Sequence, residues 1–302
     1  MLGIDICYPL LTRQIKIMKI NFTKMNGAGN DFILIDQKLN LDFILSEDLI
    51  KQMCDRRKGI GADGILFIKK NNEFDFELEY YNSDGSLGSL CGNGARCSIK
   101  YGIDNLVSSQ TETKFKCNNE VYCGSKIDEN TIQFNLNKIN EIRLNEEIII
   151  NSKKINTHFV NNGSPHTVIF WDNFKVLTKE NFDNFDLHNL GNQIRNSDFY
   201  NPSGTNVNVI KLKEDYVKIR TYERGVEAET FACGTGTVAS AIISNLILNL
   251  NPPIKFLTKD NDILTVSFEK KNSEFVKINL TGPAKINYIG TYNFFNYEEL
   301  NG

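Results

Sequence analysis

The sequence predicts an α+β fold built from two similar domains. Three observations lead to this expectation: the chain has 302 residues, its expected strands come in runs with few helices, and its second half repeats the motif order of the first. A length near 300 suggests two domains of about 150 residues each. Runs of strands, rather than strict alternation with helices, favour α+β over a parallel α/β fold. We expect the domains to span residues 18–137 and 138–285.

In the first half, short apolar stretches are separated by turns. The expected strands are Ile20–Phe22, Phe32–Ile35, Ile65–Ile68 and the alternating segment Phe74–Tyr80. Leu45–Cys54 has helical spacing, with Ser46 as a candidate N-cap. A second helix is expected from Cys91 to Tyr101, because this segment follows a turn rich in Gly and Ser.

The rest of the chain shows the same kinds of element. The expected strands are Thr131–Leu136, Ile148–Ile150, Thr157–Val160, Val168–Phe170, Val207–Leu212 and Val217–Tyr222. Cys233–Leu250 is the longest and most apolar helical pattern, and the Pro residues at 252 and 253 end it. A last strand within residues 286–302 is expected to return to the first domain.

Residues 1–17 are expected to be a poorly ordered leader. Ile4–Leu11 is mildly apolar, but basic residues follow it and no small-residue cleavage site is seen, which argues against a signal peptide. The chain has no apolar run of the ~20 residues that a membrane span needs. We therefore expect no membrane association.

Charge and cysteine content exclude other classes. Lys plus Arg total 34 and Asp plus Glu total 37, a net charge of −3, so a nucleic-acid-binding surface is not expected. Seven cysteines, an odd number, follow no framework of regular spacings. This pattern is typical of a protein in a reducing cytoplasm rather than of a disulfide-built secreted domain.

The two halves share a loose internal duplication. In each half a strand leads into a Gly turn, and about 60 to 70 residues later a Cys-Gly-X-Gly turn opens a helix. The first copy has Asn26–Asn30 and Cys91–Gly94, and the second has Asn161–His166 and Cys233–Gly236. Two similar domains facing each other would bring both Cys-Gly-X-Gly turns to one cleft.

This arrangement suits acid–base chemistry at a carbon atom. A helix N-terminus stabilises a thiolate, and its free N–H groups bind a carboxylate. Cys91 and Cys233 on opposite sides of a substrate could then remove an α-proton from one face and deliver a proton to the other. Such an inversion needs no cofactor and no metal.

The same residue types also occur in structural cores, zinc sites and nucleotide sites. Cys54, Cys97, Cys117 and Cys123 are expected to be small buried hydrophobes. A zinc site would need Cys-x-x-Cys pairs or more His, and nucleotide binding would need a P-loop or a full Gly-x-Gly-x-x-Gly. No lysine context points to a pyridoxal phosphate aldimine. A lone histidine such as His166 is usually structural, but its place in a Gly turn matched to the first one favours a role.

Several motifs together resemble the diaminopimelate epimerase family, over residues 18–294. They are Phe22–Phe32, Asn82–Ser86, Cys91–Cys97, Tyr222–Gly225 and Ala232–Gly236. The resemblance implies two similar domains, each a sheet or barrel wrapped around a central helix, with the active site in the cleft between them. It also implies a homodimer that interconverts LL- and meso-diaminopimelate without pyridoxal phosphate, for lysine and peptidoglycan precursors.

The resemblance also implies roles for particular residues. It makes Cys91 and Cys233 the acid–base pair and places His166 and Glu223 where they tune the thiol pKa values. The backbones of Gly92–Asn93 and Gly234–Thr235 would bind the carboxylate at the reacting centre. The distal end of the substrate would be bound by Asn30, Asn82, Asn206, Glu223 and Arg224.

Two departures and three rival functions stay open. Ser164 stands where many members have Asn, and Gly64 stands where some have Gln, so we assign no binding role to either. A proline-racemase-like epimerase would also use two cysteines, whereas a PhzF-like isomerase lacks them. A non-catalytic amino-acid-binding protein would bind without exchange of the α-proton.

Overall fold

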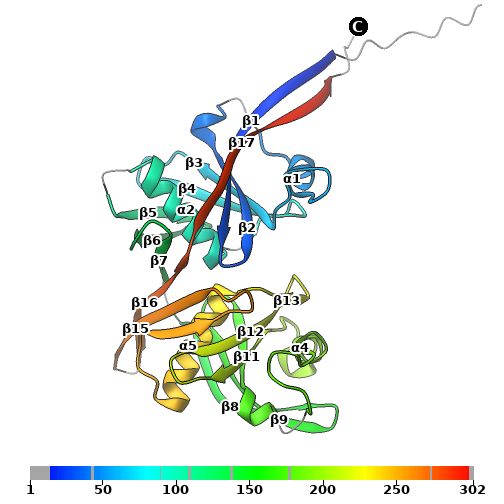
Figure 1. Ribbon diagram of the computed structural model, residues 1–302, viewed down its shortest axis with the longest axis vertical. Helices are drawn as coiled ribbons and strands as arrows, with labels where there is room; N and C mark the ends of the chain where they lie inside the picture. Colours follow the sequence, from blue (N-terminus) through cyan, green and yellow to red (C-terminus); the bar gives the residue numbers. More distant parts are fainter. Residues whose placement is uncertain are drawn as a thin grey trace, which may run out of the picture.

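The computed structural model describes residues 14–41, 44–88, 90–107, 110–136, 139–175, 178–272 and 274–298. Figure 1 shows two lobes, one built from each half of the chain, with the last strand returning along the first lobe. The α+β fold class and the duplication expected from the sequence are confirmed.

The first half contains two α-helices, a short 3-10 helix and a run of strands. In chain order they are β1 (Gln14–Gly27), β2 (Asn30–Asp36), η1 (Gln37–Leu39), α1 (Glu47–Cys54), β3 (Gly64–Lys69), β4 (Phe76–Asn82), α2 (Gly92–Asn105), β5 (Glu112–Cys117), β6 (Glu120–Lys126) and β7 (Thr131–Leu136). Ser46 caps α1 as expected, since its side chain accepts a hydrogen bond from the Leu49 N–H.

The second half has the same character, with the long helix near its end. Its elements are β8 (Glu141–Ile150), β9 (Lys153–Asn161), β10 (Pro165–Phe170), α3 (Trp171–Phe174), α4 (Leu187–Arg195), η3 (Asp198–Tyr200), β11 (Asn206–Leu212), β12 (Val217–Glu223), β13 (Ala228–Thr230), α5 (Gly234–Leu248), β14 (Ile254–Leu257), β15 (Ile263–Lys271), β16 (Glu274–Pro283) and β17 (Lys285–Glu298).

Strand pairing repeats between the halves. From β1 to β7, neighbouring strands pair antiparallel, parallel, antiparallel, parallel, antiparallel and antiparallel. The series β9, β10, β11, β12, β14, β15, β16 pairs in the same order of directions. The final strands of the two series, β7 and β16, pair antiparallel with each other and join the halves. The loose sequence duplication is therefore a duplication of topology.

Each half packs its sheet around one helix. Residues 92–103 of α2 are buried without a gap, and α2 contacts every strand from β1 to β7. In the second half α5 is buried along residues 236–244 and contacts β9, β10, β11 and β15. On the other face of each sheet a further helix covers a separate core, α1 in the first half and α4 in the second. The central helices thus have fixed N-termini.

The chain start differs from the sequence expectation. β1 begins at Gln14, four residues before the expected start of the first domain at residue 18, and residues 14–17 pair with residues 295–298 of β17. The continuous pairing of β1 with β17 extends the strand beyond the apolar stretch that sequence patterns detect. Residues 1–13 lie outside the described residues.

Some elements were not expected from the sequence. β5, β6, α4 and the strands of residues 254–283 had no counterpart in the expectation. The α4 sequence contains Gly191 and two Asn residues, which are poor helix formers, and the helix is stabilised by packing of Leu187, Leu190 and Ile194. The long helix α5 ends at Leu248, two residues earlier than expected, because Asn249 adopts a left-handed conformation.

Candidate active site

The N-termini of α2 and α5 meet where the two halves join. Cys91 and Cys233 are the N-cap residues of these helices, and both have extended backbones. Next to them, a Cβ atom on Gly234 would lie 3.4 Å from the Cα atom of Gly92. The charge on Cys91 also affects the pKa of Cys233. The structure therefore brings the two predicted acid–base cysteines together.

Both thiols are free and largely buried. Cys91 is partly buried, and Cys233 is 8% exposed. Burial raises the pKa of each thiol, that of Cys233 well above its usual range. Backbone N–H groups at the helix starts act in the opposite direction: those of Asn93 and Gly94 lower the pKa of Cys91, and that of Gly236 lowers the pKa of Cys233.

A chain of hydrogen bonds leads to the sulfur of Cys233. Thr235 Oγ1 lies 3.5 Å from Cys233 Sγ and 2.9 Å from His166 Nε2. The Thr221 hydroxyl donates to Asn208 Oδ1, which leaves Asn208 Nδ2 as the donor facing His166 Nδ1 at 3.3 Å. His166 Nδ1 is therefore the acceptor, and the proton is on Nε2. Because His166 donates to Thr235, the threonine hydroxyl can donate to the sulfur.

His166 is fully buried and acts as a neutral group. Burial, together with the positive charge of Arg224, lowers its pKa to about 3. It therefore contributes a hydrogen bond and no charge near neutral pH. Its link to the thiol of Cys233 passes through Thr235.

Glu223 interacts electrostatically with both thiols. Its carboxyl group accepts a hydrogen bond from Thr230 Oγ1, and both Thr230 and Cys233 act to lower its pKa. Burial raises the pKa of Glu223. In turn, its negative charge raises the pKa of both Cys91 and Cys233. The protonation state of this one carboxyl group thus affects both cysteines.

On the first-half side, amide side chains connect the turn after β1 to α2. Asn93 Nδ2 donates to Asn30 Oδ1 at 2.6 Å and to the carbonyl oxygen of Ala232 at 3.1 Å. Asn30 Nδ2 donates to Asp63 Oδ2 at 2.8 Å, and the buried Arg96 donates to Asn93 Oδ1 at 2.9 Å. Asn93 therefore bonds residues of both halves and holds the junction together.

On the second-half side, Asn206 occupies the start of β11 beside His166 of β10. Its Nδ2 group donates to Ser164 Oγ at 2.9 Å, and its Oδ1 atom accepts from the Arg224 N–H at 2.9 Å. The Arg224 side chain is exposed and donates to the carbonyl oxygen of Ser203. Ser164, which departs from the family pattern, thus bonds to a predicted site residue.

Asn82 lies apart from the junction contacts. It ends β4 opposite Gly64 of β3, and its Nδ2 group donates to Ser86 Oγ at 3.0 Å. Among the described residues, no hydrogen bond links Asn82 to the second half of the chain. Its predicted role toward the substrate stays a prediction.

A charged network next to Asn30 was missed by sequence reasoning. Arg56 donates to Asp31 at 2.7 Å and to Asp63 at 2.6 Å, while the buried Lys24 donates to Asp31 at 2.6 Å. Burial of Asp31 acts to raise its pKa, but Arg56 and Lys24 outweigh burial, so the pKa is lowered. The partners are far apart in sequence, and no local spacing reveals them. The network orients Asp63, which in turn holds Asn30.

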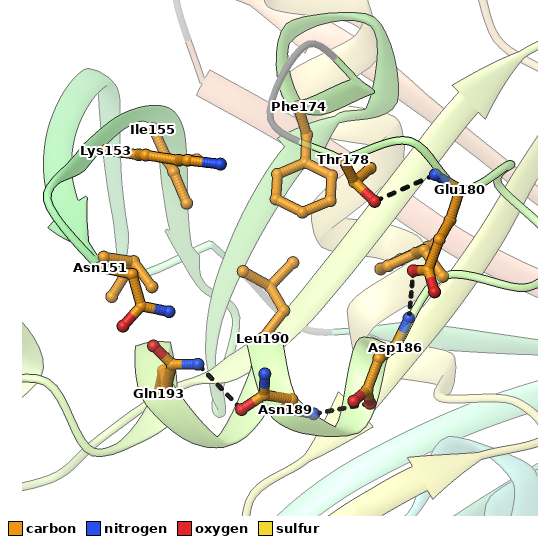
Figure 2. Close-up of a pocket in the computed structure, with 12 residues that line it drawn as sticks. Asn151, Lys153, Ile155, Phe174, Thr178, Glu180, Asp186, Asn189, Leu190 and Gln193 are labelled. Carbon is orange, nitrogen blue, oxygen red and sulfur yellow. Dashed lines mark hydrogen bonds between the residues drawn. The ribbon is translucent and has the colours of Figure 1, made fainter.

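Two pockets of the described chain lie away from these residues. One of them, near α4, has a volume of about 210 Å³ and is shown in Figure 2. Its polar groups bond to one another: Thr178 accepts from the Glu180 N–H, Glu180 from the Asp186 N–H, and Asp186 from the Asn189 N–H. Groups satisfied in this way are typical of a structural loop, so we assign the pocket no ligand.

No three His, Cys, Asp or Glu side chains of the described segments form a group suited to hold a metal ion. Among those same segments, no helix is long and apolar enough to span a bilayer.

The family model and the similar curated proteins agree on one family. A family model described as diaminopimelate epimerase matches residues 22–139 and 158–286. The diaminopimelate epimerase of Flavobacterium psychrophilum is 36% identical over 263 residues, covering 87% of this chain and 96% of that protein. The diaminopimelate epimerase of Chlorobaculum tepidum is 35% identical over 270 residues, covering 88% and 99%.

Solved structures of low sequence identity share the fold. A probable proline racemase from Agrobacterium radiobacter aligns with a TM-score of 0.67 at 10% identity, covering 90% of this chain and 92% of that one. A PhzF-family phenazine biosynthesis protein from Bacillus anthracis aligns with a TM-score of 0.65 at 11% identity, covering 92% and 99%. Both rival families considered from the sequence thus have this fold, and the fold alone does not separate their activities.

Proposed function

The chain belongs to the diaminopimelate epimerase family, and we propose that it interconverts LL- and meso-diaminopimelate by a two-base mechanism that uses Cys91 and Cys233. The observation that carries this proposal is the meeting of two cysteine-capped helix N-termini at one junction. The PhzF-like alternative lacks such a cysteine pair. The proline-racemase-like alternative has one, and is tested below by substrate choice.

In the proposed reaction, one cysteine is a thiolate and the other a thiol when substrate binds. The thiolate takes the α-proton, so an S–H bond forms as the C–H bond breaks, and the electron pair stays on the α-carbon and its carboxylate. The opposite thiol gives its proton to the other face and becomes the thiolate. The product has inverted configuration, and the two cysteines have exchanged protonation states.

The raised thiol pKa values fit this chemistry. An α-proton of an amino acid is a weak acid, and a strongly basic thiolate abstracts it better than a stable one. Burial supplies that basicity at both cysteines. The hydrogen bond from Thr235 and the helix N–H groups keep enough thiolate accessible, so the two effects together set the working pKa.

The free N–H groups at the helix starts would stabilise the developing charge. We propose that the backbones of Gly92–Asn93 and Gly234–Thr235 bind the carboxylate next to the reacting carbon, since helix N-termini favour anions. Asn30, Asn82, Asn206 and Arg224 would bind the distal amino acid end. Asn93 and Asn206 are held by bonds that fix this geometry before substrate arrives.

The direct test is transfer of solvent deuterium. Purified protein in D₂O, with no added cofactor, is expected to introduce deuterium at the α-carbon of LL-diaminopimelate as the meso form accumulates. Binding of diaminopimelate without exchange would favour the non-catalytic alternative, and exchange that requires added pyridoxal phosphate would refute the two-thiol mechanism.

We further propose a cytoplasmic homodimer that binds no nucleic acid. The net charge of −3 supports the absence of a nucleic-acid surface, and the free thiols fit a reducing compartment. Exposed apolar side chains on the β1–β17 ladder, Ile17 at 56% and Ile289 at 75%, offer a surface for a second copy. Light scattering after gel filtration is expected to give a mass near twice 34.4 kDa, and a monomer would contradict the dimer.

A further inference from the structure

Tyr80 of β4 lies against the core that surrounds α2, next to the site. Its ring meets Phe32 edge to face, with 6.1 Å between ring centroids. Tyr80 is partly buried and packs on the same core as Cys91 and Leu90. The neighbouring Tyr81 points to the opposite face of the strand, where its hydroxyl donates to Glu79.

Two glycines make room for the Tyr80 ring. A Cβ atom on Gly64 would lie 2.3 Å from the Tyr81 carbonyl oxygen and 2.7 Å from Tyr80 Cε2, and one on Gly88 would lie 2.5 Å from Tyr80 Cδ1. Real Cβ atoms essentially never approach non-bonded atoms this closely. Neither glycine has a positive φ, so the backbone conformation does not require glycine here. The ring excludes a side chain at Gly88, and at Gly64 the ring and the Tyr81 carbonyl oxygen together exclude one.

The Tyr80 hydroxyl is within electrostatic reach of charged groups of the site. Its pKa is raised, first by burial and then by the negative charges of Cys91, Asp63 and Glu223. These groups come from both halves of the chain. None of the described residues hydrogen-bonds to the hydroxyl, although a half-buried phenol usually has a partner. The hydroxyl therefore stays protonated and is available as a donor.

We propose that Tyr80 contacts the substrate and helps determine specificity, by donating a hydrogen bond from its hydroxyl to the carboxylate at the distal end of diaminopimelate. This inference rests on the proposed function. Gly64 stands where some family members have glutamine, and its missing side chain leaves the space into which the Tyr80 ring packs. Tyr80 lies two residues before Asn82 on the same face of β4, which places it beside a residue expected at the distal end.

The test compares Tyr80→Phe with Tyr81→Phe. Loss of a hydrogen bond to a charged group corresponds to roughly a tenfold to hundredfold loss of affinity. We expect Tyr80→Phe to raise KM for LL-diaminopimelate at least tenfold, with kcat within about threefold of the original protein. Tyr81→Phe, the matched control on the other face, should leave both constants unchanged.

Inhibition by L-lysine, which lacks the distal carboxylate, tests which group of the substrate Tyr80 contacts. Inhibition by L-lysine should be equally strong in the original protein and in Tyr80→Phe. An unchanged KM for diaminopimelate in Tyr80→Phe, or an equal loss with L-lysine, would overturn the inference. If the original protein itself does not exchange the α-proton of diaminopimelate, the proposed function fails instead.

A second variant keeps the inference testable if Tyr80→Phe does not fold. Gly88→Ala places a methyl group against the Tyr80 ring and leaves the hydroxyl in the chain. If the ring position matters as proposed, this variant should raise KM while thermal unfolding shows a folded protein. A folded Gly88→Ala variant with an unchanged KM would contradict the inference even if Tyr80→Phe were unstable.

Discussion

Gly92 and Gly234 approach so closely that a Cβ atom on either would be in van der Waals contact with the Cα atom of the other, at 3.4 to 3.6 Å. They are the first residues of the two central helices, so their approach sets the separation of Cys91 and Cys233. Leu280 covers both glycines from β16. The active-site geometry is therefore built on backbone contact between the halves, which side-chain changes elsewhere alter little.

The glycines two residues further along the helices, Gly94 and Gly236, give the first prediction. A Cβ atom on Gly236 would lie 2.2 Å from Asn208 Oδ1, whereas one on Gly94 would lie 3.0 Å from the Leu66 Cδ2 methyl group. Gly236→Ala should break the hydrogen-bond chain to Cys233 and destabilise the fold by about 1–3 kcal/mol. Gly94→Ala meets a flexible methyl group and should cost less. Chemical denaturation and kcat measurements check both, and equal effects would contradict the assignment.

The second prediction concerns pH. Thr235 lowers the pKa of the Cys233 thiol, so Thr235→Val should raise it. Proton abstraction needs the thiolate, and the rate in the direction that uses Cys233 as base rises as pH passes through its pKa. The rising limb of kcat/KM should therefore move to higher pH in Thr235→Val. Thr235→Ser keeps the hydroxyl and should retain the original profile. An unmoved limb in the valine variant would show that Thr235 does not act on the sulfur.

Much of the site could be predicted because its motifs are local. Cys91 and Cys233 each open a helix within a Gly-rich turn, and that context is visible in sequence. The bonds from Asn208 to His166 and from Arg56 to Asp63 join residues on different elements, and no spacing along the chain reveals them. The alternating pattern identifies Tyr80 only as one apolar residue of a strand. Its place beside the site depends on two distant glycines that the strand pattern does not connect to it.

Boundaries were predicted less well than element types, for a physical reason. β1 begins six residues before the strand expected at Ile20, because β17, from the far end of the chain, pairs with it. Similarly, β7 and β16 are joined across the halves. Long-range pairing of this kind stabilises residues whose local sequence has little strand preference.

The third prediction is reversible oxidation. The close approach of the two helix starts brings Cys91 and Cys233 together as free thiols. We expect a mild oxidant to form a disulfide between them and abolish activity, and dithiothreitol to restore it. Cys54 and Cys97 are buried in separate cores and should stay reduced, so they serve as internal controls. Mass spectrometry of the inactive protein checks this, and finding Cys91 and Cys233 both free would contradict it.

The fourth prediction is strong discrimination between substrates. Asn30 and Asn206 are already held by hydrogen bonds, so they form a rigid environment for an amino acid group. A site built to pair such groups rejects analogues that lack them by up to about 10⁴-fold. kcat/KM for proline and lysine should therefore be far below that for diaminopimelate. A comparable value for proline would support a proline racemase instead.

The central claim is that two thiols serve opposite faces of one carbon. Replacing either Cys91 or Cys233 by Ala should abolish epimerisation in both directions, because each turnover needs both groups. Each variant keeps one base, however, and elimination of halide from a β-halogenated diaminopimelate needs one base and no reprotonation. Cys97→Ala, which changes a buried cysteine outside the pair, is the control and should remain active.

The measurement that tests this claim most directly is the stereoisomer preference of that elimination in the two variants. We predict that Cys91→Ala and Cys233→Ala eliminate halide from opposite stereoisomers of the analogue, since each retains the base for one face. The same preference in both variants would mean that a single base performs all the abstraction, and the two-thiol mechanism would be wrong.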